Sequence, residues 1–134
     1  MAAAKSDKRL ASIRQGDIYW VALPAPDGSV PGIAHPHVVI QENVLNRSRI
    51  NSVVVVALTS NIRRGNETGN VILEVGEANL TRRSVVEVSK VSTVDKSQIG
   101  DYIGSITVQR VEQILSGMRF LQAISDHHET GEDQ

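Results

Sequence analysis

The hydrophobic pattern of the chain consists of short apolar runs separated by polar, glycine-rich or proline-rich stretches. The longest run, residues 53–58, reads VVVVAL and is followed directly by TSN. A run this short, rich in β-branched residues and followed by small polar ones, predicts a buried central strand. Strand alternation divides its side chains between two faces, with Val53, Val55, Ala57 and Thr59 on one and Val54, Val56 and Leu58 on the other.

Similar segments predict further strands at residues 18–23, 37–41, 70–74 and 85–94, the last as one or two strands, with a turn and a short strand at 100–105. Residues 24–32, PAPDGSVPG, are rich in proline and glycine and predict a long exposed loop. The polar residues 42–49 predict a short helical turn.

One segment near the end of the chain has the period of an amphipathic helix. Thr107 is a suitable N-cap, and Gly117 weakens the helix or marks close packing. The apolar stripe consists of Val111, Ile114, Leu115, Met118 and Leu121. Several short strands with one terminal helix predict a mainly β fold, as a small, strongly bent sheet or barrel. We expect a flexible extension at residues 1–13, one domain at 14–124 and a disordered acidic tail at 125–134.

Composition narrows the classes of protein. The 134 residues are 40% hydrophobic and 22% charged, as in an ordinary globular domain, and the absence of cysteine excludes a disulfide scaffold, a thiolate zinc site and a cysteine nucleophile. We expect no membrane segment and no signal peptide, and therefore a cytoplasmic protein. A formal net charge of −1 gives no overall attraction to nucleic acid, so any basic surface has to be local.

The end of the central strand carries the parts of a phosphate site. Thr59 supplies a hydroxyl on a rigid support, and the cations Arg63 and Arg64 follow a short turn. The alternative is a core strand that ends in an ordinary turn with two solvated arginines.

Two histidines flank a proline beside the predicted loop. Imidazoles titrate near neutral pH, so His35 and His37 could supply an acid or a base. Alternatively, His37 is bonded within its strand and His35 is merely exposed. His127 and His128 are expected to be inert, and no carboxylate cluster has metal-ligand spacing, so we predict no metal and no cofactor.

Four motifs follow one another in a characteristic order: RQGDIYWVAL, HPHVVIQ after the Pro/Gly loop, VVVVALTSN, and SVVEVSKVSTVDKSQIG. Together they resemble the MazF/PemK family of toxin ribonucleases over about residues 14–121. The resemblance implies an SH3-like barrel of the MazF/CcdB toxin type with a helix. It also implies a homodimer with its RNA groove at or near the dimer interface, and an antitoxin whose acidic flexible segment occupies that groove.

The implied activity is that of an mRNA interferase, which cleaves single-stranded RNA at a short sequence without a metal. The ribose 2′-OH attacks the adjacent phosphorus and leaves a 2′,3′-cyclic phosphate and a 5′-hydroxyl. Such a reaction requires a base, an acid and groups that stabilise the extra charge on phosphorus.

The resemblance assigns the catalytic threonine to Thr59. The family's second residue is an arginine just before the second strand, and this chain has none there. If the prolines are aligned, His35 takes its place. If they are offset by one residue, Ala34 does, and the chain would be weakly active or inactive with its RNA surface intact, as in an alanine substitution introduced to express a toxic nuclease safely.

The expected RNA-binding residues come from the same motifs and the loop beside them: Ser60, Asn61, Arg63, Arg64, Gln41, Ser89 and Lys90. The family's acidic or amide pair for reading bases is replaced here by Ser89 and Lys90, so its base preference does not transfer. Two alternatives to a nuclease are a gyrase-poisoning toxin of the same fold and a non-catalytic RNA-binding domain.

Overall fold

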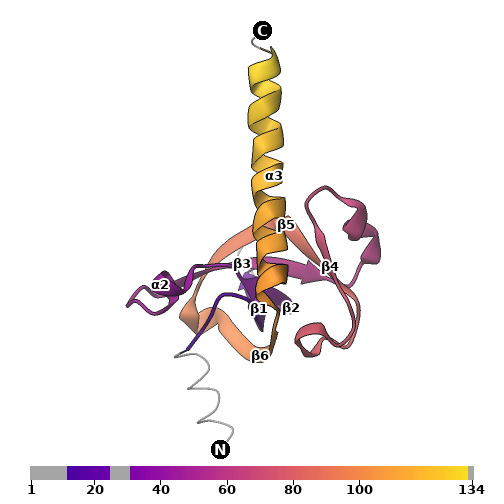
Figure 1. Ribbon diagram of the computed structural model, residues 1–134. Helices are drawn as coiled ribbons and strands as arrows, with labels where there is room; N and C mark the ends of the chain where they lie inside the picture. The colour runs from indigo at the N-terminus through magenta and orange to yellow at the C-terminus, as the bar shows by residue number, and fades with distance from the viewer. Residues whose placement is uncertain (1–11, 25–30, 133–134) are drawn as a thin grey trace, which may run out of the picture.

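A computed structural model describes residues 12–24 and 31–132, which form one curled antiparallel sheet with a long helix rising from it (Figure 1). The sheet order is β4-β5-β3-β2-β1-β6. Its strands are β1 (Asp17–Pro24), β2 (Pro31–Val39), β3 (Ser52–Thr59), β4 (Val71–Leu73), β5 (Ser84–Asp95) and β6 (Ile99–Ser105). The predicted fold class, mainly β with a C-terminal helix, is confirmed.

Strand β3 connects two hydrophobic clusters because its alternating side chains enter different ones. Val53 and Val55 lie in a cluster with Tyr19 and Ile99, whereas Val56 and Leu58 lie in the other. Apolar packing on both faces explains why this run has no polar interruption.

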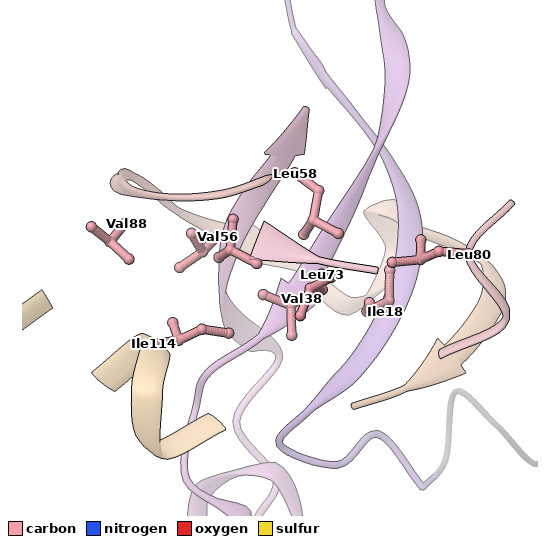
Figure 2. Close-up of a cluster of buried hydrophobic side chains, with 9 residues drawn as sticks. Ile18, Val38, Val56, Leu58, Leu73, Leu80, Val88 and Ile114 are labelled. Atoms are coloured by element: carbon pink, nitrogen blue, oxygen red, sulfur yellow. The ribbon is translucent and has the colours of Figure 1, made fainter. Parts of the chain in front are cut away.

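Helix α3 (Val108–Glu132) covers the second of these clusters. Its first turn is capped by Thr107, whose Oγ1 accepts a hydrogen bond from the Arg110 amide at 3.2 Å. Ile114 is fully buried and points toward Val38 and Val56 of the sheet (Figure 2). The predicted N-cap is therefore confirmed. Of the predicted apolar stripe, Val111 and Ile114 are buried and Met118 packs against the cluster.

A pair of glycines sets how closely α3 approaches the sheet. A Cβ atom on Gly117 would lie 2.1 Å from the carbonyl oxygen of Gly69, which precedes β4. Gly69 itself has a φ of +86°, a region that side chains rarely adopt. Close backbone contact thus explains a glycine in the middle of a helix, as its position suggested.

The aspartate at the start of β1, Asp17, has a structural function. The Asp17 carboxylate is buried and accepts hydrogen bonds from the Arg14 amide (3.0 Å), the Tyr19 hydroxyl (3.1 Å) and the Ser105 hydroxyl (2.7 Å). These bonds join β1 to the end of β6. Asp17 therefore reinforces the pairing of β1 with β6.

Several element bounds differ from those predicted. β2 begins at Pro31 rather than at residue 37, because residues 31–36 pair with β1 as the second arm of a hairpin. The centre of the predicted loop, residues 25–30, lies outside the described residues. The helical turn predicted at 42–49 is α2 (Asn43–Asn46), and residues 85–94 form the single strand β5.

The backbone of α3 is helical to Glu132, whereas the sequence predicted a disordered tail from residue 125. The bounds of the predicted domain remain a prediction. No helix in the described part of the chain has the length and apolar character needed to cross a membrane.

Replacing Gly117 with alanine tests the close helix contact. Helix propensity alone favours alanine by about 1 kcal/mol, but overpacking typically costs about 1–3 kcal/mol. We expect Gly117→Ala to lower the free energy of unfolding measured in urea. Ser116→Ala on the exposed side of the same turn is the matched control and should change it little. Stabilisation by Gly117→Ala would contradict the described contact.

Candidate active site

The site lies where β2 and β3 separate. Their antiparallel pairing joins Val39 to Val55, Val38 to Val56 and His37 to Ala57, and then it ends. The next residue of β2 is Pro36, which has no N–H to donate and is therefore compatible with the end of a ladder. Beyond it, His35 and Thr59 line the same opening between the two strands.

Thr59 is held at the last position of β3 by the turn that follows it. Its Oγ1 accepts a hydrogen bond from the Asn61 amide at 3.2 Å. The Asn61 side chain in turn accepts one from the Arg63 amide at 3.2 Å and caps the 3-10 helix η1 (Ile62–Asn66). Because the Thr59 oxygen is used as an acceptor, its proton can be donated to a ligand in the opening.

The two histidines have different environments. His37 is buried, and its Nδ1 lies 2.8 Å from the His35 carbonyl oxygen, so Nδ1 must carry the proton of the neutral ring. Burial lowers the pKa of His37 below 6.5, although the hydrogen bond to the His35 carbonyl opposes this shift. His35 is exposed. Of the two histidines, only His35 is therefore accessible to a ligand, whereas His37 is buried.

Two pockets meet at Thr59 and His35. The first, here called the aromatic pocket, has a volume of about 680 Å³ and is lined by Trp20, His35, Pro36, Thr59, Arg82 and Tyr102, among others. The second, here called the carboxylate pocket, has a volume of about 510 Å³ and is lined by His35, His37, Ala57, Thr59, Glu87 and Lys90, among others. A ligand bound at Thr59 therefore has space on both sides.

An ion pair between Arg110 and Glu77 holds the segment that leads to Arg82 against helix α3. The guanidinium of Arg110 in α3 contacts both carboxylate oxygens of Glu77, at 2.9 and 2.8 Å, in the short helix η2 (Glu77–Asn79). This contact lowers the pKa of Glu77 and raises that of Arg110. Bidentate pairs are geometrically specific, so this one holds η2 and the chain leading to Arg82.

Two of the expected RNA-binding residues line the pockets, and three follow Thr59 closely along the chain. Ser60 lines the aromatic pocket and Lys90 the carboxylate pocket, while Asn61 and Arg63 belong to the turn and η1 directly after Thr59. Arg64 is exposed and forms ion pairs with Glu67 at 2.8 Å and with Glu87 at 4.0 Å.

Three predicted residues neither line a pocket nor belong to the segment that directly follows Thr59. Ser89 is exposed but lines neither pocket, and the same holds for Ala34. Ala34 alternates with His35 along β2 and belongs to its other face.

Gln41 requires a correction, because it lies near the opposite end of β3. It is buried, donating to Asn46 Oδ1 at 2.9 Å and to the Ser52 carbonyl at 3.0 Å, while accepting from the Val54 amide at 3.2 Å. Its amide is fully used in joining β2, α2 and β3.

Sequence reasoning did not assign Trp20, Tyr102, Arg82 or Glu87 to the site. The sequence offered one signal for Trp20, because it is the single tryptophan of an aromatic-poor chain. In the structure Trp20 is 44% exposed, although Ile18, two residues earlier, is fully buried. Glu87 had no such signal, because a glutamate between valines in a strand usually faces water.

The comparisons with known proteins agree with this fold. The family model of PemK-like, MazF-like toxins of type II toxin–antitoxin systems matches residues 14–121. The chain belongs to this family. Endoribonuclease MazF6 of Mycobacterium tuberculosis is 34% identical over 107 residues, which cover 80% of this chain and 94% of the relative. Endoribonuclease EndoA of Bacillus subtilis is 25% identical over 114 residues, which cover 85% of this chain and 97% of the relative.

Solved structures confirm the MazF-type fold. An endoribonuclease in complex with its cognate antitoxin, from a mycobacterial species, has a TM-score of 0.66 at 23% identity and covers 82% of this chain and 94% of that chain. MazE–MazF from Deinococcus radiodurans has a TM-score of 0.68 at 14% identity and covers 84% of this chain and 96% of that chain.

The lowered pKa of His37 predicts a pH dependence of stability. In the unfolded chain the imidazole regains its ordinary pKa near 6.5, so below that pH the unfolded state binds more protons than the folded one. We expect the free energy of unfolding in urea to be lower at about pH 5.5 than at about pH 7.5. His37→Asn, which retains a donor near the Nδ1 position, should reduce this difference. An unchanged difference would mean that other groups cause it.

Proposed function

We propose that this protein is a sequence-specific endoribonuclease toxin that cleaves single-stranded RNA without a metal and is neutralised by a cognate antitoxin. The observation that carries the proposal is the shared position of Thr59 and His35. Both line the two pockets at the point where β2 and β3 separate. Membership of a toxin family with relatives named endoribonuclease supports the same conclusion.

The chemistry follows from what each group can do. A base removes the proton of the ribose 2′-OH, whose oxygen attacks the adjacent phosphorus. The bond from phosphorus to the 5′ oxygen then breaks, and an acid gives this oxygen a proton. The products are a 2′,3′-cyclic phosphate and a 5′-hydroxyl, so no water is consumed in this step.

Thr59 donates its hydroxyl proton in a hydrogen bond to a non-bridging phosphate oxygen, where negative charge increases in the transition state. Arg82, from the rim of the aromatic pocket, offsets that charge. His35 is the accessible imidazole beside Thr59 and transfers a proton as base or acid, while His37 supports its backbone through the Nδ1 hydrogen bond. Ser60, Asn61, Arg63 and Arg64 contact the flanking backbone.

The proposed partners are single-stranded RNA, a second copy of the chain and an antitoxin. An acidic, flexible antitoxin segment would compete with RNA for the cations that line the two pockets, Arg82 and Lys90, because both ligands are negatively charged. A solved relative of the same fold is in complex with its cognate antitoxin.

A non-catalytic RNA-binding domain is the second candidate, because neither position before Pro36 carries the family's arginine. Incubation with a long RNA in EDTA separates the two functions. Cuts that leave 5′-hydroxyl ends support the nuclease, whereas binding without cuts supports the second candidate.

Substitution of Thr59 tests the central role of its hydroxyl. We expect Thr59→Ala to reduce the cleavage rate by roughly 10²–10³-fold, as for loss of a donor to developing charge. Thr59→Ser retains the hydroxyl and is the matched control, with most of the activity preserved. RNA affinity, measured by fluorescence anisotropy, should change little in either variant. Full activity of Thr59→Ala would refute the assigned role.

The position of the missing arginine can be decided with two variants. Because His35 lines both pockets and Ala34 neither, we expect His35→Ala to slow cleavage by roughly 10²-fold or more. Ala34→Arg should leave the rate nearly unchanged. A gain of activity in Ala34→Arg would instead place the missing arginine at residue 34 and show that the chain is weakened there.

A further inference from the structure

We infer that the carboxylate pocket binds a guanine base of the RNA, next to the phosphate held at Thr59, and that Glu87 recognises its Watson–Crick edge. This inference rests on the proposed function and adds the identity of one base to it.

Glu87 is unusual because it is a carboxylate in the wall of a pocket and only 5% exposed. It forms ion pairs with Lys90 at 3.4 Å and with Arg64 at 4.0 Å, and the closest contact of each uses Oε1. Among the described residues, no hydrogen bond ends on either of its carboxylate oxygens. The acceptor capacity of these oxygens is therefore available to a ligand in the pocket.

The position of Glu87 results from an irregularity in β5. Val86 pairs with Leu58 of β3, and Val91 pairs with Val56, so residues 87–90 lie opposite the single residue Ala57. This bulge departs from strand alternation and brings both Glu87 and Lys90 to the same pocket.

The charge of the pocket favours a base over a phosphate. A buried carboxylate repels phosphate oxygens but accepts hydrogen bonds from N–H groups. Val21, Leu23 and Leu58 add apolar wall to the same pocket, which suits the faces of an aromatic ring. A volume of about 510 Å³ is sufficient for one nucleobase.

Guanine matches the two charged groups best. Its N1–H and 2-amino group are adjacent donors, which a carboxylate can accept together, and its O6 lies beside N1, where the Lys90 ammonium can donate. Adenine, cytosine and uracil each present only one kind of donor group on this edge. Thr59 lines the same pocket, so the recognised base belongs to a nucleotide adjoining the scissile phosphate.

Binding of free nucleotides tests the inference without relying on cleavage. The 3′-monophosphates of guanosine, inosine and adenosine are titrated against the protein by NMR. Inosine lacks only the 2-amino group. We expect guanosine monophosphate to bind roughly 5- to 100-fold more tightly than the other two, as for a bidentate contact to a base edge.

Three variants assign the preference to individual groups. Glu87→Gln should bring the guanosine and inosine affinities to within about 2-fold of each other, because an amide has a single acceptor atom. Lys90→Gln, at an exposed residue, should weaken guanosine and inosine monophosphates together but not adenosine monophosphate. Glu67→Gln removes the same charge from the other partner of Arg64, does not line the pocket, and should retain the preference for guanosine.

Equal affinities for the three nucleotides in the unmodified protein, or a guanosine preference that survives in Glu87→Gln, would overturn the inference. Thermal unfolding of each variant establishes that it is folded. If Glu87→Gln does not fold, the comparison with Lys90→Gln still tests the inference. Cleavage of a long RNA is scored separately. Cuts without guanine at the site refute the guanine pocket alone, whereas a guanosine preference without cuts refutes only the nuclease.

Discussion

The pairing of β2 with β3 is the constraint on which the rest of the structure depends. Three residue pairs, from Val39–Val55 to His37–Ala57, fix the register of the two central strands. A shift by one residue would exchange the faces of β3 and move Val53 and Val55 out of their cluster. The hydrophobic core therefore determines that His35 and Thr59 come together, although neither residue belongs to it.

The end of this ladder matters as much as its register. A strand without Pro36 could continue to pair with β3 as far as Thr59 and close the opening. Proline removes the donor that such pairing requires, while β2 retains its other partner, β1, through Pro31. The pairing of β2 with β3 thus ends before Thr59 and leaves the site open, while the pairing of β2 with β1 keeps the strand in place.

Local electrostatics, rather than net charge, give the site its character. A chain with a formal charge of −1 still places Arg82 and Lys90 in the walls of the two pockets that meet at Thr59. Glu67 and Glu87 hold Arg64 nearby, and these contacts raise the pKa of its guanidinium. Burial lowers the pKa of His37, so this histidine adds no positive charge to the wall of the carboxylate pocket near neutral pH.

The sequence predicted the elements whose signals are local. The apolar run of β3, the cap at Thr107 and the glycine at position 117 each depend on neighbours within a few residues. It missed features that depend on distant pairing: residues 31–36 resemble a loop until β1 is placed beside them, and Gln41 resembles a surface residue until α2 and β3 close over it. Glu87 was missed for the same reason, since a bulge, not alternation, directs it.

That bulge separates the wall of the carboxylate pocket from the core packing of β5. Pairing on either side of residues 87–90 is fixed by Val86 and Val91, which contact Leu58 and Val56. Mutations between these two anchor points can alter the pocket wall while the strands keep their alignment. The lining of the carboxylate pocket can therefore change while the packing of the core stays the same.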